Sequence, residues 1–160
     1  MDYQVIRNTI ISRLHKALGM PVILSDQTGE RPAFPFVSYT VTSPYLPLGG
    51  PIKTILTADG MPYELTTYQI EIVFSFTAHD AAADGAITTA LKMVDYYQRT
   101  AQTELASAGI VIVNVSDVQN RDQILVMEYE RRSGLDVRFR VIDQTIGPAE
   151  IIETADIHEV

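Results

Sequence analysis

The stretch from residue 63 to 78, YELTTYQIEIVFSFTA, constrains the fold most, because its apolar and polar residues alternate over a long run. One set of alternate positions is apolar and the other is polar: Tyr68, Ile70, Ile72, Phe74 and Phe76 against Gln69, Glu71, Ser75 and Thr77. A two-residue period predicts a β-strand with one face in a core. At about 3.3 Å per residue such a strand spans roughly 50 Å. We therefore expect part of it to project beyond the core or to bend at a bulge.

Two segments show the three- and four-residue apolar spacing of helices. The first begins after Asp2, a predicted N-cap, and ends at Gly19, which suits a left-handed cap. The second is predicted to begin with Asp80 as its N-cap and to end at Ala108 and Gly109. Its predicted buried stripe comprises Ile87, Ala90, Leu91, Val94, Tyr97, Ala101 and Leu105.

Further strands are predicted where β-branched and aromatic residues concentrate. They cover residues 21–26, 36–43, 110–118, 124–132 and 135–143, and residues 119–122 form a predicted turn. Ser133 and Gly134 are predicted to be the two-residue turn of a hairpin that joins the last two strands. Leu135, Val137, Phe139 and Val141 form the predicted inner face of that hairpin.

Residues 44–62 are predicted to be a long loop, because four prolines and three glycines disfavour a regular central strand or helix. The segment is nevertheless rich in apolar residues: Tyr45, Leu46, Leu48, Ile52, Ile55, Leu56 and Met61. A long apolar loop is unusual, since loops normally face water. Either it folds over the core of its own domain, or a partner buries it.

The order helix, strands, helix, strands predicts a single α+β domain, in which a mostly antiparallel, mixed β-sheet packs with two main α-helices. A length of 160 residues suits one domain. We assign residues 1–143 to this domain and residues 144–160 to an acidic and apolar C-terminal arm. The arm forms either a last strand of its own sheet or a segment that docks on a neighbour.

Signals of catalysis are weak. There is no cysteine, and His15, His79 and His158 lack the spacing of metal ligands. No phosphate-binding loop is present, and no Ser, His and Asp grouping stands out, although the members of a triad need not be near one another in sequence. We expect no enzyme activity, no cofactor and no metal. The first ten residues do not resemble a signal peptide, and no apolar run reaches the roughly 20 residues that span a bilayer.

The positive charge is concentrated in one region. The formal net charge is −8, which disfavours nucleic acid as the main partner, yet five of the nine arginines fall between Arg121 and Arg140. Acidic residues are interleaved with them: Glu128, Glu130 and Asp136. A surface of mixed sign favours docking against another surface of mixed sign over phosphate binding.

Three stretches carry a family resemblance: PAFPFVSYTVTS, YQIEIVFSFTAHD and GIVIVNVSDVQNRDQILVMEYERRSGLDVRFRV. Over roughly residues 1 to 143 the chain resembles the neck-terminator and tail-terminator family of long-tailed bacteriophages and related phage-tail-like particles. The resemblance implies a small α+β subunit that closes into a ring, usually a hexamer. Such a ring caps the tail tube, stops its polymerisation and docks on the head-side connector.

The resemblance also implies a structural virion protein at the tail–neck junction, assembled in the host cytoplasm, without catalysis or a cofactor. Its partners would be copies of itself, the tail tube protein and neck or connector proteins; DNA would pass through the lumen without specific binding, and no membrane would be involved. The alternatives are a head-completion or stopper protein, and a small ligand-binding domain or enzyme of unknown substrate.

Two sets of residues are candidates for contact with subunits or partners. The first is apolar: Tyr45, Leu46, Leu48, Ile52, Ile55 and Leu56. The second set is Arg131, Arg132, Arg138 and Arg140, which we expect to meet acidic groups of an adjacent subunit or a tail protein. The competing interpretation is that Glu128, Glu130 and Asp136 of the same hairpin neutralise these arginines.

Overall fold

The computed structural model describes residues 1–82, 84–124 and 129–149. Within these residues the chain forms one mixed, mostly antiparallel sheet of eight strands with three helices, which confirms the predicted α+β class. The elements in chain order are α1 (Tyr3–Leu18), β1 (Val22–Leu24), β2 (Phe36–Pro47), β3 (Ile52–Ala58), β4 (Met61–Asp80), α2 (Gly85–Gln98), α3 (Thr100–Ala106), β5 (Val111–Val115), β6 (Gln119–Asn120), β7 (Gln123–Ile124) and β8 (Tyr129–Pro148).

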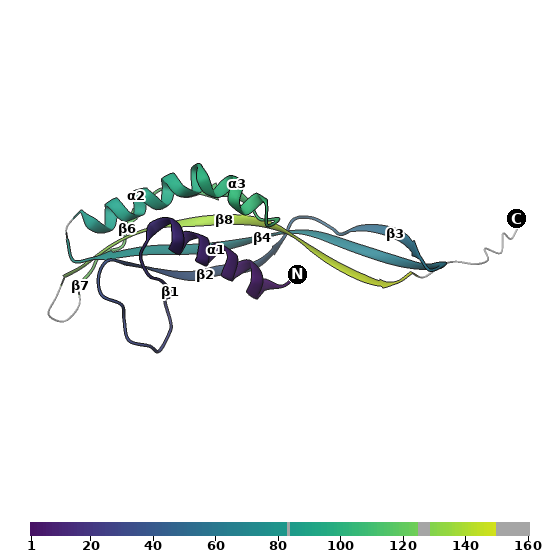
Figure 1. Ribbon diagram of the computed structural model, residues 1–160, viewed down its shortest axis with the longest axis horizontal. Helices are drawn as coiled ribbons and strands as arrows, with labels where there is room; N and C mark the ends of the chain where they lie inside the picture. Colours follow the sequence, from purple (N-terminus) through teal and green to yellow (C-terminus); the bar gives the residue numbers. More distant parts are fainter. Residues whose placement is uncertain (83, 125–128, 150–160) are drawn as a thin grey trace, which may run out of the picture.

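Two strands of 20 residues each, β4 and β8, form the centre of the sheet (Figure 1). They pair antiparallel from Tyr63 opposite Pro148 to Asp80 opposite Arg131. The strand order is β1-β2-β4-β8-β5, with β3 paired to β4 and with β6 and β7 paired to β8. The long strand predicted at 63–78 is therefore confirmed, and it extends by two residues at each end.

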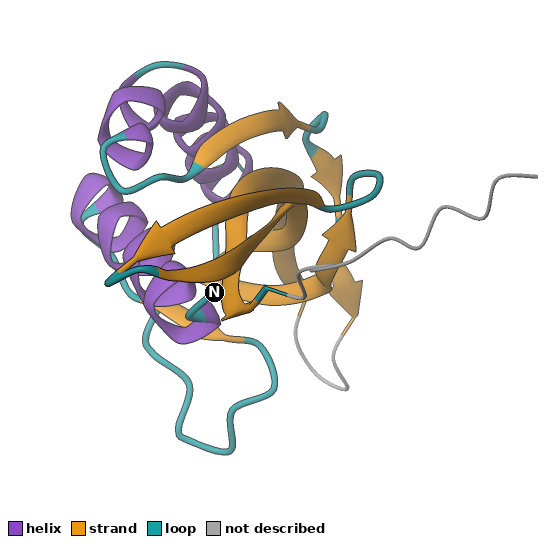
Figure 2. Cartoon of the chain, turned by 90° about the vertical axis from the view of Figure 1, so that its right-hand side faces the viewer, coloured by secondary structure: helices purple, strands orange, loops and turns teal. Residues whose placement is uncertain are grey.

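The helices lie together on one side of the sheet (Figure 2). With the exception of Tyr68, which is only partly buried, the alternate residues of β4 and β8 that were predicted to face inward are buried beneath them: Ile70, Ile72, Phe74, Phe76, Leu135, Val137, Phe139 and Val141. Tyr97 of α2 packs edge-on against Phe139, with ring centroids 5.7 Å apart. The core thus occupies the helix-covered half of the two long strands, where apolar burial stabilises the fold.

The first helix begins and ends as predicted. The Asp2 carboxylate accepts a hydrogen bond from the backbone N–H of Val5 at 3.1 Å, which satisfies one of the unpaired donors of the first turn. Gly19 ends the helix with a φ of 66°, the left-handed conformation that glycine adopts without strain.

The predicted hairpin at Ser133 and Gly134 is wrong, because β8 runs straight through both residues. They pair with Ala78 and Thr77 of β4 in an uninterrupted register. A Cβ atom on Gly134 would lie 2.6 Å from Nη1 of Arg121 and 2.6 Å from the carbonyl oxygen of Phe76. The glycine therefore allows a side chain to pass close over the strand, rather than a turn.

The predicted loop at 44–62 is also wrong. β2 continues to Pro47, and its register against β4 shifts twice, between Val41 and Ser43 and between Ser43 and Leu46. β3 then forms a hairpin with β4 around Asp59 and Gly60, whose φ angles are 51° and 75°. Positive φ at both positions of a two-residue turn is typical of hairpins. Among the described residues, β3 pairs with β4 alone, so the prolines of the segment before it interrupt no hydrogen bonds to a second neighbouring strand.

The second helix differs from its prediction in three ways. Its N-cap is Asp84, whereas Asp80 accepts a bond from the backbone N–H of Ala82. A non-helical Arg99 separates α2 from α3. Ile87 and Leu91 are exposed, because the buried stripe runs through Ala86, Ala90, Met93, Tyr96 and Tyr97. The predicted turn at 119–122 likewise contains β6, which pairs with β8.

Candidate interaction surface

Part of the sheet projects beyond the helices (Figure 1). This extension comprises β3, residues 61–69 of β4 and residues 142–148 of β8, paired side by side. None of the three helices covers it in the described part of the chain. The expectation that the long strand projects beyond the core is therefore confirmed.

One face of the extension is apolar. Leu56 lies opposite Tyr63, and Tyr63 lies opposite Pro148, while Leu65 lies opposite Ile146. Because side chains alternate along a strand, these residues share a face with Ile52 and Ile142. Ile52 is 61% exposed and Ile146 is 67% exposed. Ile55 is on the opposite face and is also exposed. A sheet that is apolar and exposed on this scale is characteristic of an interaction site.

The six apolar candidates from the sequence all lie in or beside this extension: Tyr45, Leu46, Leu48, Ile52, Ile55 and Leu56. Their exposed fractions run from 36% for Leu46 to 61% for Ile52. The first alternative, that this segment folds over its own core, is therefore wrong for the described residues. Burial by a partner remains a prediction.

The arginines of β8 form ion pairs within the chain. Arg138 and Arg140 both bind the carboxylate of Glu71, at 3.2 and 2.9 Å. Glu71 lies directly opposite Arg140 on β4 and is only 4% exposed. Sequence reasoning missed Glu71 as their partner, because a register between distant strands decides which carboxylate they meet.

The other two candidate arginines also have partners. Arg131 binds Asp122 at 3.2 Å, and Arg132 binds Glu130 at 2.6 Å. Asp136 instead binds Arg121 at 3.0 Å. Thus Glu130 is the one predicted acid that neutralises a candidate arginine among the described residues, and Glu128 lies outside them. Arg138 and Arg140 keep side chains that are 48% and 41% exposed.

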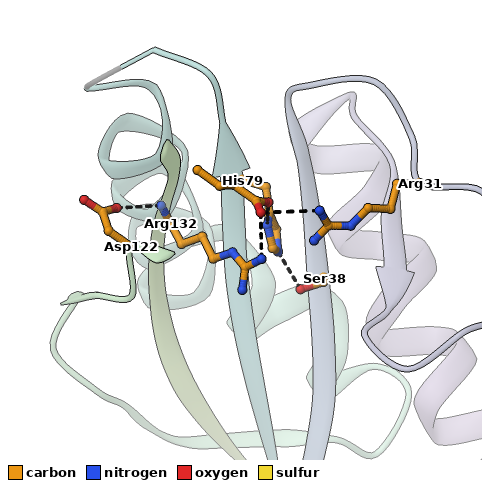
Figure 3. Close-up of polar contacts among 6 residues, drawn as sticks. Arg31, Ser38, His79, Asp122 and Arg132 are labelled. Carbon is orange, nitrogen blue, oxygen red and sulfur yellow. Dashed lines mark hydrogen bonds and ion pairs between the residues drawn. The ribbon is translucent and has the colours of Figure 1, made fainter. Parts of the chain in front are cut away.

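A buried polar network joins strands β2, β4 and β8 at the end of the sheet away from the extension (Figure 3). It lies on the same face of β4 as Glu71. The Ser38 hydroxyl lies 2.8 Å from Nε2 of His79, and Nδ1 of His79 lies 2.7 Å from Oε1 of Glu130. The other oxygen of Glu130 accepts from Arg132 at 2.6 Å and from Arg31 at 3.3 Å. The ring of His79 stacks on Phe36 at 4.4 Å. Sequence gave no signal for this grouping, whose members lie on separate elements.

The network shifts two pKa values. Burial lowers the pKa of His79 and outweighs the opposing effect of its bond to Glu130. Burial alone would raise the pKa of Glu130, but hydrogen bonds from Arg132 and His79 outweigh it and lower that pKa to about 2. His79 is therefore neutral and Glu130 charged at neutral pH.

The connectivity of Ser38, His79 and Glu130 is that of a catalytic triad, yet its surroundings favour a structural role. Ser38 lies in β2 between β1 and β4, so its backbone N–H belongs to a sheet ladder and is not available as an oxyanion donor. The carboxylate of Glu130 is held by Arg132 of the same strand and by Arg31, which joins the loop before β2 to β8, while its bond to His79 joins β8 to β4. The described residues hold no group of three or more side chains suited to bind a metal. None of their helices is long and apolar enough to cross a membrane.

Comparison with protein families gives a match over nearly the whole chain. A family model described as phage neck terminator protein matches residues 8–160. The match includes the stretch after Asp143, which the resemblance found in the sequence did not reach. No curated protein matches the chain.

Proposed function

Because the chain belongs to the phage neck terminator protein family, we propose that it assembles into a homo-oligomeric ring, a hexamer, that caps the tail tube, ends tube polymerisation and joins the tail to the head-side connector. Members of this family are structural components of the phage neck, so the protein belongs to the virion. DNA passes through the lumen of the proposed ring without specific binding. Assembly takes place in the host cytoplasm.

The exposed apolar face of the extension is the observation that carries this proposal. Ile52, Leu56, Ile142 and Ile146 lie in water in the isolated chain, each more than one third exposed. Burying such side chains is favourable by about 25 cal/mol per Å² of apolar area. In a ring, one patch of each subunit meets a different patch of the next. An extension that leaves the body of the subunit is suited to reach over a neighbour in this way.

The second proposed contact is the cluster of Arg138 and Arg140 on β8 with Glu71 on β4, which we call the arginine ladder. Arg138 and Arg140 hold Glu71 and keep side chains that are 48% and 41% exposed, so a carboxylate of the next subunit can bind their exposed N–H groups. A variant with Arg138→Ala, Arg140→Ala and Glu71→Gln removes the ladder without leaving a buried unpaired charge. We expect weaker self-association from it, measured by light scattering; an unchanged mass at equal concentration would contradict this contact.

Tube capping is tested by adding the purified protein to growing tail tubes and imaging them by electron microscopy. We expect density at one end of each tube and a halt in elongation. Tubes that elongate at the same rate, with bare ends or with protein along their walls, would show that the chain is not the terminator.

A further inference from the structure

A groove on the helix side of the molecule has no role in the contacts described above. It lies between α1 and the pair α2 and α3, and its volume is about 1160 Å³. Its apolar lining includes Ala17, Leu18 and Leu91, and Leu91 is 56% exposed. Leu91 belongs to the stripe that the sequence predicted to be buried, so the helix presents to this groove an apolar residue that its own core does not use.

The groove carries unpaired positive charge. Among the described residues, no carboxylate lies within ion-pair distance of Arg13, Lys16 or Lys92. Nη1 of Arg13 is buried and has no hydrogen-bond partner there. A buried N–H without an acceptor costs free energy, which an incoming carboxylate would recover.

The two acidic residues of the groove are already engaged. Asp95 binds Arg99 at 2.8 Å, and Glu104 accepts a hydrogen bond from the hydroxyl of Tyr96 at 3.1 Å. The groove therefore offers apolar surface together with three cations, against one carboxylate, Glu104, that is not paired with a cation, and this balance suits a peptide that is both acidic and apolar.

The last residues of this chain have that chemistry. Residues 150–160 lie outside the described residues, and their sequence is EIIETADIHEV. Carboxylates occur at every third position: Glu150, Glu153, Asp156 and Glu159. Isoleucine or valine occurs at 151, 152, 157 and 160, and no Lys or Arg follows Arg140. We propose that the C-terminal segment of one copy, residues 150–160, binds the groove between α1 and α2–α3 of a neighbouring copy.

The direction of β8 favours a neighbour over the same chain. β8 runs away from the helices along the extension and ends at Pro148 (Figure 1). Eleven extended residues reach at most about 36 Å. To reach the groove of its own chain, the segment must first run back along the extension, and this takes roughly half of its length. If extensions pack on neighbours, as the proposed ring requires, each C-terminal segment is delivered to the next subunit without reversal. This inference deepens the ring proposal and rests on it.

Photo-crosslinking in the full chain tests the proposal. Leu91 is replaced by benzoylphenylalanine, and equal amounts of unlabelled and ¹⁵N-labelled protein are assembled together, irradiated and digested with trypsin. Trypsin releases residues 141–160 as one peptide, because no Lys or Arg lies within it. We expect cross-links from Leu91 to this peptide that join a light to a heavy chain. Cross-links confined to one isotope would place the segment in its own groove, and their absence would remove the groove as its site.

Charge reversal supplies the specificity control. Lys16→Glu with Lys92→Glu should lower the yield of covalent dimer, measured before digestion, at least tenfold, and adding Glu153→Lys with Asp156→Lys should restore it. Arg7→Glu changes the same charge on α1 outside the groove and should leave the yield unchanged. Equal yields from the groove variant and the Arg7 variant would overturn the proposal.

The ring and the groove can fail separately. A ring of normal mass without cross-links to residues 141–160 removes the groove proposal and leaves the ring. If the chain stays monomeric, a fluorescent peptide of residues 149–160 is added in excess to the Leu91 variant. Cross-linking of that peptide then supports the groove without the ring, and no cross-linking removes both.

Discussion

The side chain of Arg121 joins three segments of the sheet at one point. Its guanidinium donates to Ser75, to Thr77 and to the carbonyl of Phe76 on β4, and it binds Asp136 on β8. It passes directly over Gly134, where any larger residue would fill its space. Gly134 thus leaves the space that the guanidinium of Arg121 occupies.

Gly134→Ala should destabilise the protein by about 2 kcal/mol, because the added methyl group meets backbone as well as Arg121 and cannot be relieved by a side-chain movement alone. Gly147→Ala on the same strand is the matched control, since nothing lies within 4 Å of its added Cβ. Its effect should stay within about 0.5 kcal/mol. Urea unfolding followed by circular dichroism measures both, and equal effects would contradict the account of Gly134.

The network around His79 makes stability depend on pH. Both His79 and Glu130 have pKa values below their unfolded values of 6.5 and 4.5. The unfolded chain therefore binds protons more readily in acid, and the stability from these groups is lost as the pH falls. For His79 the loss begins below about 6.5, and for Glu130 it runs from about 4.5 down to about 2.

Glu130→Gln should lower the free energy of unfolding at pH 7 by about 3 kcal/mol, because Arg132 then lies largely buried without its counter-ion. The variant should also lose the part of the pH dependence between about 4.5 and 2. Glu64→Gln, which breaks the exposed pair with Lys53, is the control and should change stability far less. Denaturant unfolding across the pH range measures both; a variant with the slope of the native chain would refute this assignment.

At the scale of elements, the two central strands β4 and β8 are longer than the core to which they contribute. The alternation at 63–78 and the spacing and caps of α1 were sufficient to predict β4 and the first helix, since each signal is local. The continuity of β8 through Ser133 and Gly134 was not predictable in this way. Ser-Gly is compatible with a turn, and only the long ladder with β4 decides for a strand.

Strand β3 of the extension was mispredicted as a loop for a related reason. The prolines and glycines of residues 44–62 disfavour a strand, although a short edge strand forms there. The turn at Asp59 and Gly60 joins two strands whose apolar residues do not pack in the core. The apolar residues singled out from the sequence are exposed, but the strand that carries three of them, Ile52, Ile55 and Leu56, was not predicted. Sheet pairing places them at one end of the molecule.

Hydrogen exchange should distinguish the two halves of β4. Residues 70–78 lie under helices and should exchange slowly, whereas residues 61–67 are covered by no helix of the described chain, are exposed or partly exposed, and should exchange much faster in the isolated chain. Assembly should slow the second set and leave the first nearly unchanged. Equal protection of both halves before assembly, or no change on assembly, would argue that the extension is not the contact surface.

At the scale of the whole molecule, the fold class and the family followed from the sequence, while the arrangement of the charges did not. The chain keeps its core at one end and an apolar extension at the other (Figure 1). On the face of the sheet opposite the core, Glu71 forms ion pairs with Arg138 and Arg140, whose partner could not be predicted from the sequence. The helix-covered core and the exposed apolar extension are thus separate parts of one sheet.

The most direct test of the account is the mass of the assembled protein for two matched variants. Ile52→Asp places a charge on the apolar face of the extension, and Val5→Asp places one on α1; the two residues are similarly exposed, at 61% and 58%. Light scattering over a range of concentrations should give about six times the chain mass of 17.8 kDa for the native chain and for Val5→Asp, and a smaller mass for Ile52→Asp. If Ile52→Asp assembles as the native chain does, or if the native chain stays monomeric both alone and with tail tubes, the extension does not build a ring.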